Sequence, residues 1–132
     1  MPIYATDQQL YSCFKALFGR IEKEDREAEQ ELLKSKMSIR FRCSEPTADI
    51  LIDAENKPLQ IVYGSHSKKP TLDIALSADT LHEILLGNLK LSKALGSKRL
   101  KPKGPVWKSF ALEPLLHQAQ KVYPEILKAC NP

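Results

Sequence analysis

The period of the hydrophobic pattern changes twice along this 132-residue chain. Apolar residues recur every three or four positions before residue 35, which is typical of amphipathic helices. Between residues 37 and 76 they alternate with polar residues, which predicts half-buried β-strands. The helical period returns at Ser77. Because helices flank a single block of strands, the pattern predicts an α+β fold.

Two helices are expected before the strands. Asp7 suits the N-cap of the first helix, and Gly19 or Arg20 marks its end. The second helix covers residues 22–34, where good helix formers dominate and the apolar stripe is thin. Most of its surface is therefore expected to face water.

Four strands are expected, at residues 37–43, 48–53, 59–63 and 72–76. The connections between them are short, so we expect an antiparallel meander. Carboxylates on the polar faces, such as Asp49 and Asp73, are expected to pair across strands with Arg40 or Arg42. Ser77 can cap the helix that follows, and Gly87 is its expected end.

The last third of the chain predicts one more helical turn at residues 92–95 and an edge strand at 98–101. A final helical region follows Gly104. Pro114 and Pro124 lie within this region, so we expect two or three helical pieces, each with proline near its first turn. The expected sheet is mostly antiparallel and four- to five-stranded, with helices packed on one face. The order is two helices, four strands, two helices, the edge strand and a helix.

Composition agrees with one domain and one core. Hydrophobic residues make up 42% and charged residues 27%, both typical of globular chains. No apolar run could span a membrane, and neither a secretory signal nor a peroxisomal or prenylation motif is present, so we expect a cytoplasmic protein. The three cysteines, Cys13, Cys43 and Cys130, are odd in number and far apart, which predicts free thiols.

Residues 90–108 contain seven basic residues and no acidic one. Such a stretch is typical of a solvated face, and it also attracts polyanions or anionic small molecules. It lacks the interleaved aromatics and Gly/Arg repeats of RNA-binding surfaces, which argues against nucleic acid. The expected partners are anionic lipid headgroups, an anionic membrane surface or the phosphate of an acyl-CoA.

The sequence contains no arrangement typical of an enzyme. His66, His82 and His117 lack a second ligand at metal-binding spacing, since the adjacent His82 and Glu83 side chains diverge on a helix. The motifs of a nucleophile elbow, a zinc protease, a dinucleotide fold or a P-loop are missing. We therefore expect a protein without catalytic residues, metal or cofactor.

From Pro70 onward, the chain resembles the sterol carrier protein type two family of sterol-binding and lipid-transfer domains. Residues 72–87 carry the resemblance, with a strand, an acidic cap at Asp79 and an apolar helix that a glycine ends. The family's spacing is retained as far as Gly104. The sequence departs from the family at Leu95, Lys98 and Pro102. Because proline cannot donate a ladder hydrogen bond, Pro102 predicts a short fifth strand.

The resemblance implies that residues 1–132 form one lipid-binding domain, which encloses an aliphatic ligand between sheet and helices without changing it chemically. The implied ligands are a fatty acid, a fatty acyl-CoA, a sterol or other isoprenoid, or a phospholipid. The apolar residues expected to line the cavity are Phe14, Phe18, Phe41, Ile74, Leu81, Leu85, Leu89, Leu95, Trp107, Phe110 and Leu115. The residues expected to bind an anionic headgroup are Lys98, Arg99, Lys101 and Lys103. The final helical pieces are the expected gate.

Two other interpretations remain open. A nucleic-acid- or protein-interaction module could use the basic stretch 90–108. Alternatively, a domain of this fold could have lost its cavity and serve as a scaffold for a partner.

Overall fold

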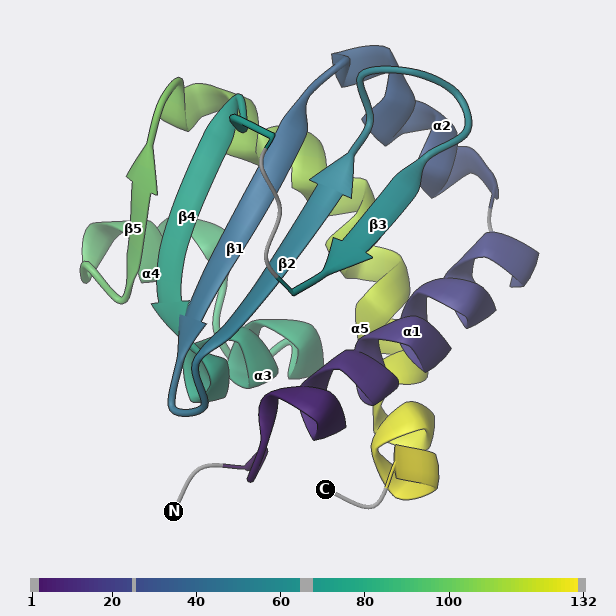
Figure 1. The fold of residues 1–132 in the computed structure, drawn as a ribbon, viewed down its shortest axis with the longest axis vertical. Coiled ribbons are helices and arrows are strands. Elements are labelled where there is room, and N and C mark those ends of the chain that lie inside the picture. Colours follow the sequence, from purple (N-terminus) through teal and green to yellow (C-terminus); the bar gives the residue numbers. More distant parts are fainter. Residues whose placement is uncertain (1–2, 25, 65–67, 131–132) are drawn as a thin grey trace.

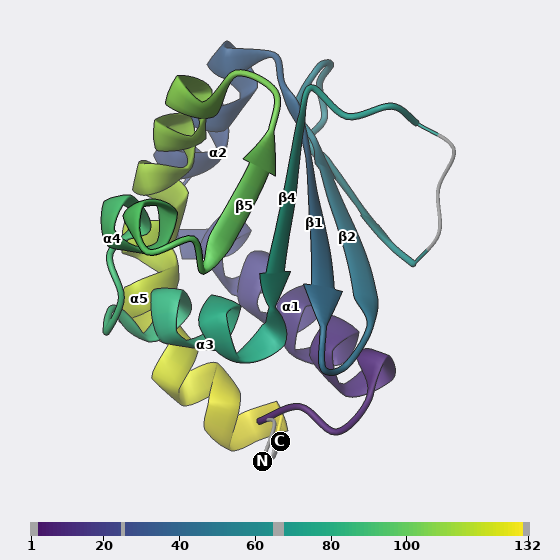
Figure 2. The ribbon, with the colours of Figure 1, turned by 90° about the vertical axis from the view of Figure 1, so that its left-hand side faces the viewer.

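In the computed structural model, one five-stranded sheet has the long helices on a single face (Figure 1, Figure 2). The structure describes residues 3–24, 26–64 and 68–130. His66, which the sequence placed in a loop, lies outside the described residues. The α+β class predicted from the sequence is confirmed, and the sheet is mixed.

The elements follow one another in the order helix, helix, four strands, two helices, strand and two helices. They are α1 (Asp7–Glu24), α2 (Arg26–Ser35), β1 (Ser38–Ser44), β2 (Ala48–Asp53), β3 (Gln60–Tyr63), β4 (Leu72–Ser77), α3 (Ala78–Leu86), α4 (Leu91–Gly96), β5 (Leu100–Lys103), the 3-10 helix η1 (Val106–Leu112) and α5 (Glu113–Cys130). No helix in the described residues is both long enough and apolar enough to cross a bilayer.

The strand order is β3-β2-β1-β4-β5, so the predicted meander is wrong at β4. Strand β4 pairs with β1 in parallel, whereas the other three pairings are antiparallel. Residues 64–71 are more than a tight hairpin needs, so the chain is free to leave the β3 edge. Beside β1, β4 is an interior strand, and Leu72 and Ile74 are completely buried. This burial favours the parallel pairing.

Helix α1 is longer than the sequence predicted, because it passes Gly19 and ends at Glu24. A single glycine costs a helix only about 1 kcal/mol. Two features offset this cost. Ile21 continues the buried stripe, and Arg20 forms ion pairs with Glu24 at 2.8 Å and with Glu125 of α5 at 2.7 Å.

The helix caps agree with the sequence in one case and differ in another. Thr6, rather than Asp7, caps α1, because its hydroxyl accepts a hydrogen bond from the backbone N–H of Gln9 at 3.1 Å. Ser77 caps α3 as predicted, accepting from the backbone N–H three residues later at 3.0 Å. Gly87 ends that helix in the left-handed conformation, with φ of 85°.

The C-terminal region has two helical pieces, η1 and α5. Pro114 lies in the first turn of α5, as predicted, but Pro124 lies inside this helix and does not break it. Proline removes one backbone hydrogen bond from a helix. Buried side chains on both sides of it, Val122, Tyr123 and Ile126, hold the helix against the core.

The fifth strand is short, as Pro102 predicted, but it covers residues 100–103 rather than 98–101. Lys98 has a φ of 63°, which belongs to a turn and not to a strand. Pro102 lies opposite Ile74 on the outermost strand, where the missing N–H interrupts no interior ladder.

The two faces of the sheet differ in polarity. Alternate residues of β1, β2 and β4 face the helices and form the buried core. On the opposite face, Arg40 pairs with Asp49 at 2.5 Å and Arg42 with Asp73 at 2.7 Å, which confirms the expected cross-strand ion pairs. The apolar side chains are therefore gathered between sheet and helices.

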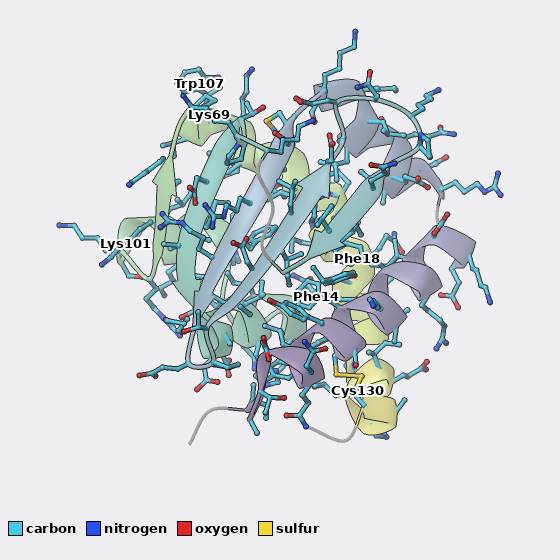
Figure 3. The ribbon with its side chains drawn as sticks, viewed as in Figure 1. Phe14, Phe18, Lys69, Lys101, Trp107 and Cys130 are labelled. Carbon is cyan, nitrogen blue, oxygen red and sulfur yellow. A yellow bond between two sulfur atoms is a disulfide. The ribbon has the colours of Figure 1, made fainter. Side chains whose placement is uncertain are left out.

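The prediction of three free thiols is wrong for two of them. Cys13 of α1 and Cys130 at the end of α5 form a disulfide, and their Cα atoms are 5.6 Å apart (Figure 3). That distance is ordinary for a disulfide. Cys43 is free and buried. This pair could not be predicted from the sequence, because packing of α1 against α5 brings together residues 117 positions apart.

Counting thiols checks the disulfide. Unfolding the protein with iodoacetamide and no reductant should alkylate one cysteine, Cys43, whereas prior reduction should expose three. Mass spectrometry gives the count, and a C43A variant should show no alkylation without reductant. Three alkylated cysteines without reductant would contradict the pairing.

Two glycines should respond to alanine in opposite ways. Gly104 has a φ of 116°, and a Cβ there would lie 2.6 Å from the carbonyl oxygen of Thr71, so G104A should lower the free energy of unfolding by about 2 kcal/mol or more. Gly19 lies within α1 with open space around it, so G19A should raise that energy by up to about 1 kcal/mol. Urea unfolding measures both changes. The same sign for both variants would contradict this description.

Candidate functional site

A small apolar cavity lies where the helices meet the β3 edge of the sheet. Its volume is about 40 Å³. The apolar walls come from α1, the β3 segment and α5, and acidic side chains of α1 and α2 also line it. These residues are Phe18, Ile21, Leu59, Ile61, Leu115, Glu22 and Glu29. An apolar cavity of about 150 Å³ holds benzene in another protein, so this space is too small for a hydrocarbon chain.

Two wider grooves beside α2 continue from this cavity. The first, of about 460 Å³, shares Glu22 and Glu29 with the cavity and runs past Lys57 and Pro58. The second, of about 760 Å³, shares Leu33 and other residues with the first. We call these two grooves together the α2 groove. It adjoins the cavity at Glu22 and Glu29, which line both.

Helix α2 is held to the rest of the protein by few side chains. Only Ala28 and Leu32 of its ten residues are buried, whereas α1 and α5 each bury five or more. A helix that buries so little apolar surface is displaced at low energetic cost. Moving α2 outward would join the cavity to the α2 groove.

Most of the apolar residues predicted from the sequence are core residues in this structure. Those that are buried are Phe14, Phe41, Ile74, Leu81, Leu85 and Leu115, and those that are partly buried are Phe18, Leu89 and Leu95. Of this set, Phe18 and Leu115 line the cavity. Phe14 lies beside Phe18, with the ring centroids 5.5 Å apart, between α1 and the β3 side of the sheet (Figure 3). Leu89 lies in a separate groove of about 290 Å³ between α5 and the α3–α4 connection.

Trp107 and Phe110 lie on the outer surface of η1, 72% and 44% exposed. The four predicted headgroup residues, Lys98, Arg99, Lys101 and Lys103, are also exposed, and they lie in or next to β5. Strands β5 and β3 are opposite edges of the sheet. A five-stranded sheet is about 19 Å wide, so the structure does not bring these basic residues to the cavity.

Sequence reasoning did not single out Ile21, Leu59 and Ile61 as cavity residues. Ile21 continues the apolar stripe of α1, and Leu59 and Ile61 lie two positions apart around the polar Gln60, so each had a signal as a core residue. The predicted meander would place β3 between two strands. Its position at an edge, where the cavity opens, was therefore missing from the prediction.

The far end of α5 is fixed by a buried polar cluster. The hydroxyls of Tyr4 and Tyr123 are hydrogen bonded at 2.5 Å, and His82 Nδ1 of α3 lies 2.8 Å from the Tyr123 hydroxyl. Burial raises the pKa of both tyrosines, which keeps them neutral. This cluster and the disulfide at Cys130 anchor the C-terminal half of α5.

The opposite face of the sheet has a polar groove of about 580 Å³ next to α1. Its lining includes Arg40, Arg42 and Asp49, and burial raises the pKa of Tyr63 there to about 12. Such a lining does not suit a hydrocarbon chain. Burial also raises the pKa of Cys43 to about 12, so this thiol is protonated at neutral pH and is a poor nucleophile. Within the described residues, no three His, Cys, Asp or Glu side chains form a metal-binding group.

A mixed five-stranded sheet with helices on one face matches the α+β fold of the sterol carrier proteins. The chain belongs to the SCP-2 sterol transfer family, whose sequence model matches residues 14–117. This is a family of lipid-binding and lipid-transfer domains. A search of curated proteins found no match.

Several solved structures share the fold. The apo sterol carrier protein 2 of Yarrowia lipolytica is 21% identical with a TM-score of 0.64, and the match covers 84% of this chain and 89% of that one. Sterol carrier protein domain 2 of Helicoverpa armigera is 19% identical with a TM-score of 0.66, covering 86% and 89%. The palmitated SCP2L2 protein of Aedes aegypti is 13% identical with a TM-score of 0.59, covering 80% and 91%.

Enlarging the cavity should allow a small apolar molecule to bind. L115A removes a buried cavity wall, so it should lower the free energy of unfolding by about 2–5 kcal/mol and create room for benzene. The midpoint of thermal unfolding, measured with and without benzene, should rise with benzene for this variant. L81A, a similarly buried leucine of α3 that does not line the cavity, is the control and should show no rise. An equal response of both variants would contradict the position of the cavity.

Proposed function

We propose that this protein binds a lipid with an aliphatic chain at the β3 edge and transfers it without chemical change. Family membership and the apolar cavity beside Phe18, Ile61 and Leu115 support this proposal. A fatty acid, a fatty acyl-CoA, a sterol or other isoprenoid and a phospholipid all supply the required apolar surface. The palmitated protein of Aedes aegypti, which has the same fold, supports a fatty chain as the ligand.

Opening of the cavity is part of the proposal, because 40 Å³ holds no chain. Helix α2 is the proposed lid, since it buries only Ala28 and Leu32 and lines the groove that adjoins the cavity. The far half of α5 is anchored by the Tyr123 hydroxyl and by Cys130. The proposed gate is therefore α2, in place of the final helical pieces that the sequence suggested.

The free energies are sufficient for reversible binding. Each methylene removed from water contributes about 0.8 kcal/mol, so about twelve of them contribute near 10 kcal/mol. Association, chain ordering and exposure of the α2 contacts together cost several kcal/mol of this. The remainder corresponds to a Kd near micromolar. A carrier needs such an affinity, because its ligand must also leave. No catalytic group takes part.

Adjacent residues of β3 provide a matched test. Ile61 lines the cavity, whereas Val62 pairs with Leu51 on the other face of the sheet, and both are partly buried. I61E places a charge against the ligand, so it should weaken binding of a fluorescent fatty acid at least tenfold. V62E should leave the affinity within about twofold. Fluorescence titration of the two variants measures the difference.

Mass spectrometry of organic extracts of the purified protein tests the proposal directly. Stoichiometric lipid in the wild-type extract, and its loss from I61E, are the expected results. Absence of lipid from the extract, together with no binding of the fluorescent fatty acid, would contradict the proposed function.

A further inference from the structure

The most exposed apolar side chains of the described residues lie on η1. Val106 is 39% exposed, Trp107 72% and Phe110 44%. Trp107 is the single tryptophan of the chain. Large apolar side chains exposed together on a surface are typical of an interaction site. We call Trp107 and Phe110 the η1 patch.

The backbone holds the η1 patch outward. The turn at Gly104 lies against the Thr71 backbone and directs the chain from β5 into η1. Side chains three positions apart lie on the same side of a 3-10 helix. Ser109 and Leu112, three apart, are buried on the inner side of η1. Trp107 and Phe110, also three apart, therefore share the outer side.

Basic residues flank the η1 patch. Lys103 precedes it at the end of β5, and Lys108 lies within η1. Both are exposed, and no acidic side chain of the described residues forms an ion pair with them. The next acidic residue along the chain is Glu113. The patch therefore combines an aromatic centre with a positive rim.

We propose that the η1 patch docks onto the surface of an anionic lipid bilayer. Tryptophan is enriched at membrane interfaces, where its ring reaches the apolar region and its N–H stays near the headgroups. Lysines near a bilayer contribute by attraction to anionic headgroups. The positive charges beside the η1 patch therefore complement an anionic bilayer surface. This inference rests on the proposed function, because a lipid carrier must meet a membrane to load or unload.

The position of η1 agrees with this role. Helix η1 packs against both α2 and α5. A bilayer held at Trp107 would therefore lie next to α2, the proposed lid of the cavity. The four predicted headgroup residues, Lys98, Arg99, Lys101 and Lys103, are far from the cavity. They lie along the β5 edge, which leads to the η1 patch.

The single tryptophan allows a direct test on the full chain. Trp107 emission should shift to shorter wavelength with vesicles of phosphatidylglycerol and phosphatidylcholine but not with phosphatidylcholine alone. Brominated lipids in the anionic vesicles should quench it. K103Q/K108Q should weaken vesicle binding about 25-fold, about fivefold for each lysine. The control K121Q/K128Q, which removes two exposed lysines of α5, should leave binding unchanged.

Sedimentation with vesicles extends the test to the aromatic centre. W107A should lower the affinity for the anionic vesicles about tenfold or more, because the variant has no indole ring to bury in the bilayer. Fluorescent fatty-acid binding without vesicles should be unchanged in K103Q/K108Q. If the wild-type protein bound vesicles but no fatty acid, the proposed function would be contradicted and the docking proposal would stand.

Several results would overturn the docking proposal. With vesicles, they are no emission shift with anionic lipid, an equal shift with neutral lipid, or an equal loss of binding in the control K121Q/K128Q. Without vesicles, a concentration-dependent shift would indicate self-association. A shift with RNA but not with vesicles would indicate a nucleic-acid partner.

Discussion

The parallel pairing of β1 with β4 determines where the functional surfaces of this protein lie. It places β1 and β4 in the interior of the sheet, and it leaves β3 and β5 as the two edges. The cavity and the α2 groove are next to one edge, and the η1 patch follows the other. A meander of the same strands would have β3 inside the sheet, and the cavity would then have no opening along that strand.

Filling of the core is the second constraint. The apolar side chains of β1, β2 and β4 pack against α1, α3 and α5 and leave about 40 Å³ at the β3 edge. Interiors are close-packed, so this region cannot accept a ligand without movement of an element. Helices α1 and α5 are joined to each other by the Cys13–Cys130 disulfide and by the Arg20–Glu125 ion pair. Movement is thus directed to α2, of which only Ala28 and Leu32 are buried.

The sequence allowed most of the elements to be predicted, because periodicity and caps are local. The alternation from Ile39 to Cys43 and the Ser77 and Gly87 caps are examples. Properties that depend on distant residues were not predictable. Strand order, the Cys13–Cys130 pair and the continuity of α5 at Pro124 each follow from tertiary packing. For the same reason, Phe18 and Leu115 were recognised as apolar, but the edge where they meet was not.

Both described ends of the chain are fastened on the side of the molecule away from η1 and α2 (Figure 1). The backbone N–H of Ile3 donates to Asp79 of α3 at 2.9 Å, and Cys130 is bonded to α1. A tag, a fusion partner or an immobilising linker attached beyond Ile3 or Cys130 therefore leaves the η1 patch and helix α2 accessible. Attached to a sensor or to another domain through either described end, the protein would present η1 and α2 on the side away from the attachment.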